Sequence, residues 1–139
     1  MPKVEASVPV DRASLLVVDD EPAVLKVTQM LLERRGYQVV ACHSAEEALA
    51  WLGRAVFDVV LSDVQMPGMG GLGLLRVVHE QDAELPVILV TGNPTDEAEM
   101  VAKELRAFQY LTKPVRYERL NEVVADATHS SRRSSRSTK

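Results

Sequence analysis

Five side chains suited to phosphoryl transfer lie at the ends of short apolar runs of the sequence. They are Asp19, Asp20, Asp63, Thr91 and Lys113. A carboxylate can act as a nucleophile toward phosphorus, and crowded carboxylates attract a hard divalent cation because like charges disfavour ionisation. A phosphoryl group in transfer also needs an ammonium and a hydroxyl donor around its oxygens. If the fold brings these side chains together, they suit metal-assisted phosphoryl transfer to a carboxylate.

The apolar runs themselves are expected to be strands of a parallel sheet. They are short, rich in Val and Leu and nearly continuous, which is typical of strands buried on both faces. The expected strands cover residues 15–18, 37–42, 56–63, 87–90 and 108–112. Apolar residues at helical spacing predict helices over 22–35, over 45–52, from about 71, from 94 to 105, and up to 127.

Alternation of strands and helices predicts an α/β fold of the flavodoxin-like class. We expect a doubly wound, five-stranded parallel sheet in the order 2-1-3-4-5 with five helices. Ligands bind such sheets beyond the carboxyl ends of the strands, where the strand order reverses. Here that point lies between the first and third strands. The first strand runs into Asp19 and Asp20, and the third ends in Asp63. The fold should therefore bring the candidate residues close together.

Local signals also predict where two of the helices begin. Ser44 and Glu47 form a capping box in which each side chain can satisfy an orphan backbone donor of the other residue. Asn93 and Pro94 are the expected N-cap and first residue of the fourth helix.

The three carboxylates form the candidate metal site. An all-oxygen, partly hydrated set of ligands suits Mg²⁺, with Mn²⁺ as the alternative, and two carboxylates can hold the ion while the third faces an electrophile. The histidines His43, His79 and His129 show no ligand spacing, and we expect them to face solvent.

Composition excludes several other classes of protein. The formal net charge of −4 becomes −8 over residues 1–127, because four of the 16 basic and none of the 20 acidic residues follow them. An acidic body argues against direct nucleic-acid binding. No apolar run is long enough to predict a membrane span, the first residues lack the basic-then-apolar order expected of a signal peptide, and the single Cys42 argues against a disulfide framework. We expect a cytoplasmic protein with a mobile arm over 1–13, one domain over 14–127, and a disordered basic Ser/Arg tail or linker over 128–139.

From about Leu15 to Ala127 the chain resembles the receiver domains of response regulators, including chemotaxis regulators, in two-component systems. Four motifs in order carry the resemblance: Val17–Glu21, Ser62–Pro67, Val90–Gly92 and Tyr110–Pro114. Each motif is weak alone, but together at these strand ends they are specific.

The resemblance implies a role for each motif residue. Asp63 would be the phosphoacceptor and, with Asp20 and the backbone carbonyl of Gln65, a metal ligand, while Asp19 would act through a metal-bound water. Lys113 and Thr91 would contact the phosphoryl oxygens, and the Lys113–Pro114 bond would be cis. Thr91 and Tyr110 would form the switch.

The implied function is a signalling phosphoswitch rather than an enzyme. A sensor histidine kinase or a phosphotransfer protein would phosphorylate Asp63 with Mg²⁺, changing the surface of the fourth helix, fifth strand and fifth helix. The signal would pass to an output protein or to an output domain missing from this chain. Whether phosphorylation drives dimerisation stays open. The alternative is a receiver fold that acts as a phosphorylation-independent interaction module. A flavodoxin-like cofactor binder is disfavoured because Asp19, Asp20 and Glu21 would repel the FMN phosphate.

Two departures from the family pattern concern glycine. Gly70-Gly71 replaces the usual Asp-Gly, and with Gly68 and Gly73 it is expected to loosen the loop and the helix start. Arg106 occupies the place of a helix-ending glycine, where a left-handed conformation would cost about 1 kcal/mol.

Overall fold

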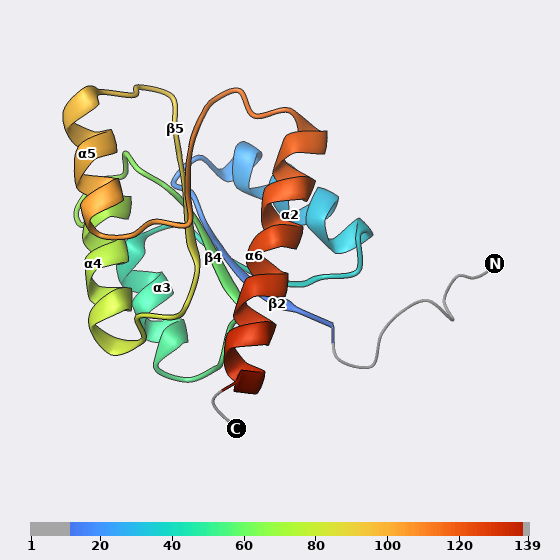
Figure 1. Ribbon diagram of the computed structural model, residues 1–139. Helices are drawn as coiled ribbons and strands as arrows, with labels where there is room; N and C mark the ends of the chain where they lie inside the picture. The colour runs from blue at the N-terminus through green and yellow to red at the C-terminus, as the bar shows by residue number, and fades with distance from the viewer. Residues whose placement is uncertain (1–11, 138–139) are drawn as a thin grey trace.

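The computed structural model describes the backbone of residues 12–137 and the side chains as far as Ser131 (Figure 1). Its strands are β2 (Ser14–Val18), β3 (Gln38–Cys42), β4 (Val59–Asp63), β5 (Val87–Thr91) and β6 (Gln109–Thr112). They form one parallel sheet in the order β3-β2-β4-β5-β6. Numbered by appearance in the chain, this is 2-1-3-4-5, and the predicted fold is confirmed.

Helices cover both faces of the sheet. They are α2 (Pro22–Arg34), α3 (Ala45–Leu52), α4 (Gly71–Gln81), α5 (Asp96–Glu104) and α6 (Tyr117–Ser137). In Figure 1, α3, α4 and α5 lie on one side of the sheet, and α2 and α6 lie on the other. Within the described range, no helix combines the length and the apolar character needed to cross a bilayer.

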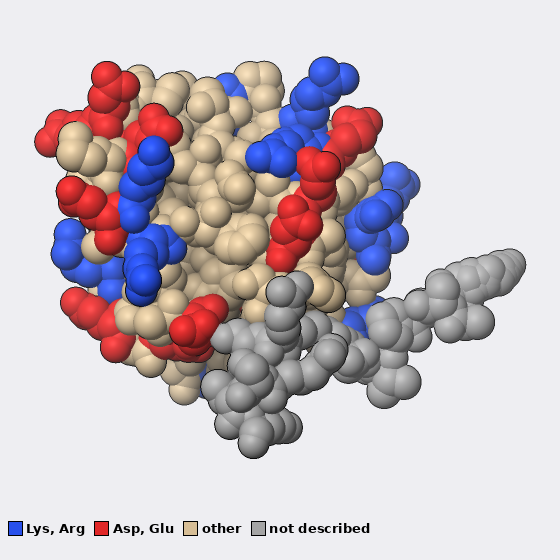
Figure 2. All heavy atoms as spheres, viewed as in Figure 1, with Lys and Arg blue, Asp and Glu red and all other residues tan. Residues whose placement is uncertain are grey.

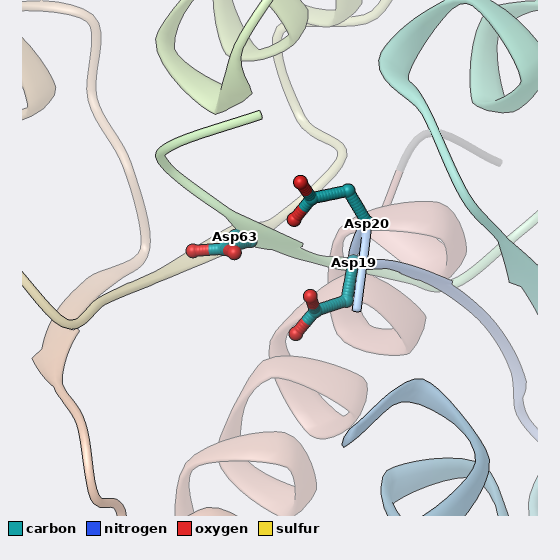
Figure 3. Close-up of side chains that lie close together, drawn as sticks. All are labelled: Asp19, Asp20 and Asp63. Atoms are coloured by element: carbon teal, nitrogen blue, oxygen red, sulfur yellow. The ribbon is translucent and has the colours of Figure 1, made fainter. Parts of the chain in front are cut away.

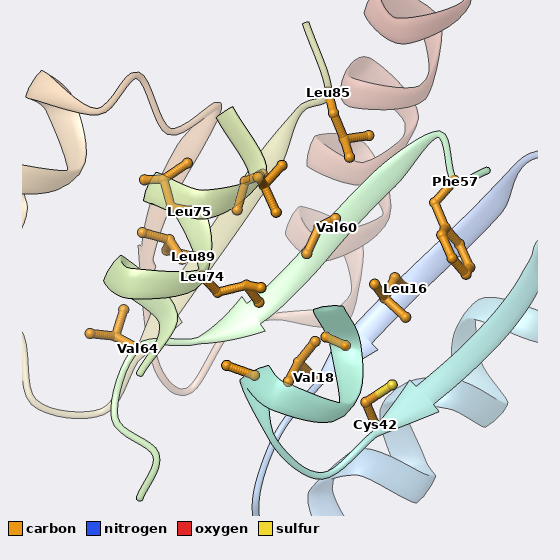
Figure 4. Close-up of a cluster of buried hydrophobic side chains, with 14 of the residues drawn as sticks. Leu16, Val18, Cys42, Phe57, Val60, Val64, Leu74, Leu75, Leu85 and Leu89 are labelled. Atoms are coloured by element: carbon orange, nitrogen blue, oxygen red, sulfur yellow. The ribbon is translucent and has the colours of Figure 1, made fainter. Parts of the chain in front are cut away.

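Alternate residues of the inner strands supply two separate hydrophobic cores. In β2, Leu16 and Val18 belong to the core under α3, α4 and α5, whereas Leu15 and Val17 belong to the core under α2 and α6. Figure 4 shows the first core, in which Leu16 and Val60 lie with leucines of α4. Burying one such leucine contributes about 2 kcal/mol. Because both faces are covered, the strands need continuous apolar runs rather than alternation.

The domain begins slightly earlier than predicted. Residues 1–11 of the expected arm lie outside the described range, but Ala13 is buried and its carbonyl accepts a hydrogen bond from the Gln38 N–H at 2.9 Å. The Ser14 N–H donates to the Asp58 carboxylate at 2.8 Å. These contacts attach the chain to the sheet from Ala13 onward.

The fifth helix is longer than predicted. The tail expected to be disordered from residue 128 instead continues α6 to Ser137, and residues 138–139 lie outside the described range. Neither Gly nor Pro occurs after Ala127, so nothing local stops the helix. The Thr128 hydroxyl donates to the Val124 carbonyl at 2.8 Å, which satisfies that side chain within the helix. A polar composition was therefore an insufficient reason to predict disorder.

Side-chain caps begin α3 and α5, but not entirely as predicted. Ser44 accepts a hydrogen bond from the Glu47 N–H at 3.1 Å, while the Glu47 carboxylate accepts from the N–H of His43 rather than of Ser44. The N-cap of α5 is Thr95, whose hydroxyl accepts from the Ala98 N–H at 3.0 Å, and the prediction of Asn93 was wrong. The acidic residues that follow Thr95 favour this start because they complement the positive end of the helix.

Arg106 is the one described non-glycine residue with a positive φ, at 66°. Its N–H donates to the Lys103 carbonyl at 3.0 Å, and the Ala107 N–H donates to the Ala102 carbonyl at 2.9 Å. The left-handed residue thus closes α5 and turns the chain toward β6, a conformation that the sequence had left open.

His79 links two helices and a loop instead of facing solvent as predicted. It is half-buried on α4, and its Nδ1 and Nε2 each lie 2.9 Å from a backbone carbonyl oxygen, of Leu105 and Leu85 respectively. Leu105 is the C-cap of α5. The imidazole therefore joins α4 both to the end of α5 and to the loop before β5. Sequence spacing carried no signal of this contact, because both partners are backbone atoms.

Replacing His79 should destabilise the fold. His79→Ala is expected to lower the free energy of unfolding by about 1–2 kcal/mol, because it removes the imidazole N–H from which a partly buried carbonyl oxygen accepts a hydrogen bond. Urea unfolding measures the difference. His43→Ala is the matched control: His43 is exposed, and its loss should change stability by less than about 0.5 kcal/mol. Equal effects of the two substitutions would contradict a structural role for His79.

Candidate functional site

Three carboxylates meet beyond the carboxyl ends of β2 and β4. These strands are parallel neighbours, with Val18 opposite Ser62, so Asp19 and Asp63 follow at the same edge of the sheet. Oxygen atoms of Asp19, Asp20 and Asp63 lie within 4.8 Å of one another. Figure 3 shows the three carboxylates around a shared space, two from the end of β2 and one from β4. Asp19 and Asp63 are buried, whereas Asp20 is exposed.

Lys113 brings an ammonium group to these carboxylates from the end of an edge strand of the sheet. It follows β6, and its N–H donates to the Thr91 carbonyl at 2.7 Å. Its Nζ lies 3.4 Å from an oxygen of Asp63, 3.5 Å from one of Asp19 and 3.7 Å from one of Glu21. The Lys113–Pro114 bond is cis, as the resemblance implied.

The environment makes Asp63 reluctant to ionise. Burial is the main cause of its raised pKa, and the neighbouring Asp19 and Asp20 carboxylates add to it, although Lys113 acts in the opposite direction. Burial also lowers the pKa of Lys113, but the Asp19 and Asp63 carboxylates outweigh it and leave that pKa above its usual value. The site thus holds a firmly protonated ammonium group and an excess of negative charge.

The donor set fits a hard divalent cation. All three side chains offer carboxylate oxygens, and the exposure of Asp20 leaves room for water in the coordination sphere. Asp20 and Gln65, whose carbonyl the family resemblance implied as a ligand, line the same open hollow at this edge. Oxygen ligands with several waters match the preference of Mg²⁺ and Mn²⁺.

Thr91 lies at the end of β5, fully buried, with its hydroxyl already engaged. The Oγ1 atom donates to the Gln65 Oε1 at 2.8 Å and accepts a hydrogen bond from the Asn93 N–H at 3.0 Å. The sequence suggested a role for the Gln65 backbone carbonyl but did not predict this bond of its side chain. Gln65 and Thr91 are 26 residues apart, and only the parallel pairing of β4 with β5 brings them together.

Tyr110 lies on β6 opposite Leu89 of β5 and packs against the core under α5. Its hydroxyl is buried, and within the described residues no side chain or backbone group forms a hydrogen bond with it. A buried hydroxyl without a partner costs about 1–3 kcal/mol. This arrangement therefore favours any state in which the phenol reaches water or another polar group.

Two glycines that the sequence predicted to loosen the helix start instead allow close packing. A Cβ at Gly70 would lie 2.7 Å from the Val64 carbonyl oxygen, and a Cβ at Gly71 would overlap the Asp63 carbonyl oxygen. The Gly71 N–H donates to the Val64 carbonyl at 2.9 Å. The start of α4 is thus pressed against the backbone that carries Asp63.

Comparisons with known proteins agree with this geometry. A family model described as the response regulator receiver domain matches residues 15–125. The transcriptional regulatory protein GlrR of Escherichia coli is 35% identical over 119 residues, which cover 86% of this chain. A regulator of a phosphoglycerate transport system, PgtA of Salmonella typhimurium, is 34% identical over 122 residues, or 88% of this chain.

The solved structures agree as well. A CheY-like response regulator receiver domain protein from Methanospirillum hungatei superposes with a TM-score of 0.86 at 30% identity, covering 89% of this chain and 99% of that one. By contrast, the matched regions cover only 27% of GlrR and 29% of PgtA, so those regulators are much longer than this chain. The family match covers most of the chain and includes every strand end of the site. The chain therefore belongs to the response regulator receiver family, the signalling phosphoswitch domain of two-component systems.

Proposed function

We propose that Asp63 is the phosphoacceptor of this receiver domain. The main support is its position: a buried carboxylate lies 3.4 Å from an ammonium group and shares a site with two further carboxylates. An oxygen of Asp63 would attack the phosphorus of a phosphohistidine. The P–N bond would break, and the imidazole would leave with its electron pair and take up a proton. Later attack by water on phosphorus would release inorganic phosphate and restore the carboxylate.

Mg²⁺ is the proposed cofactor, with Mn²⁺ as a substitute. Asp20, Asp63 and the Gln65 carbonyl would ligate it directly, and Asp19 would hold one of its waters. When bound, the ion would neutralise charge on the phosphoryl oxygens. The crowding of three carboxylates supports this assignment, because a divalent cation offsets the repulsion from Asp19 and Asp20 that adds to the effect of burial on the pKa of Asp63.

Lys113 and Thr91 are proposed to receive the phosphoryl oxygens. The ammonium group of Lys113 already contacts Asp63 and needs only a small shift to meet a group attached there. The Thr91 hydroxyl lies at the end of the neighbouring strand β5. Its movement toward the phosphoryl group would vacate space that Tyr110 fills, and the buried, unpartnered hydroxyl of Tyr110 supports this switch.

The responding surface is proposed to consist of α5, β6 and α6. Figure 2 shows uncharged side chains on this face, between the charged residues of α5 and those of α6. A shallow groove between α5 and β6 is lined by residues that include Tyr110. A change at Tyr110 would therefore alter a surface that a partner can contact.

The proposed partners lie on both sides of the signal. A sensor histidine kinase or a phosphotransfer protein would donate the phosphoryl group. The downstream partner would be an output protein or an output domain, since GlrR and PgtA are longer regulators that match this chain over only part of their length. Phosphorylation-dependent pairing of two receiver domains is an additional route for output.

Acetyl phosphate tests the proposed chemistry without a kinase. With Mg²⁺, the protein should gain one phosphoryl group by intact-protein mass spectrometry, and hydroxylamine should remove it as expected of an acyl phosphate. Removing the metal with EDTA should abolish labelling, because charge on the phosphoryl oxygens is then poorly neutralised. No labelling of the folded protein with Mg²⁺ present would instead favour the phosphorylation-independent interaction module.

A further inference from the structure

The side chain of Gln65 closes a ring of hydrogen bonds around the Thr91 hydroxyl. Gln65 Oε1 accepts from Thr91 Oγ1 at 2.8 Å, and Thr91 Oγ1 accepts from the Asn93 N–H at 3.0 Å. Gln65 Nε2 donates to the Asn93 carbonyl oxygen at 3.4 Å, which completes the ring with a weaker bond. The ring connects the loop after β4 to the loop after β5.

This ring directs the only proton of the Thr91 hydroxyl away from Asp63. A hydroxyl has one proton to donate, and here it is given to Gln65. The same proton is the one that Thr91 would offer to a phosphoryl oxygen on Asp63. The two bonds therefore exclude each other.

We propose that Gln65 is a positioning residue that holds Thr91 in the unphosphorylated arrangement and so weakens the response to phosphorylation. This inference rests on the proposed function, because it assumes that Thr91 moves to the phosphoryl group. Gln65 acts through its side-chain amide oxygen, independently of its backbone carbonyl.

The energetic effect follows from the burial of Thr91. Its side chain is fully buried, so without Gln65 the hydroxyl of the free protein lacks a good acceptor, and a buried polar group without a partner is unfavourable. The phosphorylated state is not affected in this way, because its Thr91 donates to the phosphoryl group. Removing the acceptor at residue 65 should therefore favour the phosphorylated state.

Beryllofluoride binding measures this equilibrium without hydrolysis. Gln65→Met keeps the length of the side chain but lacks the amide oxygen, and because Gln65 is exposed the variant should fold. With Mg²⁺ present, titration followed by ¹⁹F NMR should show binding about fivefold tighter than in the wild type, the gain expected from one ordinary hydrogen bond. Unchanged or weaker binding would overturn the proposal.

A double-mutant cycle shows whether Gln65 acts through the hydroxyl. Thr91→Val removes the hydroxyl at nearly constant volume, and in that background Gln65→Met should change the affinity by less than about twofold. In a Thr91→Ser background, which keeps a hydroxyl, the fivefold gain should persist. The same gain in the Thr91→Val background would overturn the proposal.

Beryllofluoride binding distinguishes failure of the phosphoacceptor function from failure of the role of Gln65. If the wild type does not bind beryllofluoride with Mg²⁺, the proposed phosphoacceptor function is wrong. If the wild type binds and Gln65→Met binds equally well, the phosphoacceptor function stands and only the role of Gln65 is refuted.

Discussion

Asp63→Asn should lose phosphorylation by acetyl phosphate completely and, without a divalent cation, unfold at a higher temperature than the wild type. The amide lacks the nucleophilic carboxylate oxygen, so no acyl phosphate forms. It also removes a buried negative charge from a site that contains two others. Loss of phosphorylation together with a gain of stability in the same variant would show that the Asp63 charge destabilises the fold but is needed for phosphoryl transfer.

The stability effect should depend on pH in a defined direction. The pKa of Asp63 is raised mainly by burial, so the folded state binds its proton more tightly than the unfolded state. Ionised Asp63 therefore costs stability at neutral pH, and this cost disappears as the pH falls through the folded-state pKa toward the unfolded value of about 3.9. The difference in Tm between variant and wild type should be largest near neutral pH and shrink as the solution becomes acidic.

Thermal unfolding in EDTA at a series of pH values tests this prediction, with mass spectrometry for phosphorylation. Added Mg²⁺ should raise the Tm of the wild type more than that of the variant, because the variant has lost a ligand. The matched control is Asp58→Asn, just before the opposite end of β4, where the carboxylate accepts a hydrogen bond from Ser14. Asp58→Asn should still be phosphorylated. A wild type more stable than Asp63→Asn in EDTA at neutral pH would contradict the electrostatic account.

Gly71→Ala should cause the largest loss of stability among single substitutions near the site. The new Cβ would overlap the Asp63 carbonyl oxygen and lie 3.0 Å from the Val64 Cα. These are backbone atoms of the strand end, so relief requires α4 to move away from β4. Overpacking of this kind costs about 3 kcal/mol. Because the strain falls on the backbone of Asp63, the proposed phosphoacceptor, phosphorylation should slow as well.

Gly73→Ala is the matched control for this prediction. Both glycines lie in the first turn of α4, but a Cβ at Gly73 would meet only the side chain of Met69. Met is flexible, and Ala favours the helix over Gly, so stability should change by less than about 1 kcal/mol. Urea unfolding compares the two variants. Similar losses for both would show that helix α4 tolerates no added side chain anywhere, rather than being limited by its contact with Asp63.

The order of the elements and the members of the acidic site were predictable from the sequence. Continuous apolar runs are local and specify strands covered on both faces, and five strand–helix units leave few topologies. In a parallel sheet, residues that end neighbouring strands meet at one edge. The meeting of Asp19 and Asp63 therefore followed from the predicted strand order, whereas the contact of Lys113 with them depends on its side chain reaching past β5. The sequence placed Arg106 where a helix-ending glycine is usual, but it did not decide whether Arg106 would be left-handed.

The contacts between loops and between helices were decided only by the tertiary structure. Gln65 bonds to Thr91, and His79 contacts the backbone carbonyls of Leu85 and Leu105. The spacing of these residues in the chain matches no helix or strand period, so the sequence could not predict the contacts. The role of Gly71 depends on how closely α4 approaches β4. A glycine in a sequence can indicate either a flexible backbone or a close approach between two backbone segments.

Element boundaries formed an intermediate case. Thr95 rather than Asn93 caps α5, and α6 continues past Ala127. Near each boundary, several residues had propensities suitable for starting or ending the helix. Packing against the sheet or the lack of a helix breaker selected among them. Local sequence thus determined which groups reach the site. The three-dimensional packing of the strand ends determined which of those groups form hydrogen bonds and ion pairs with one another.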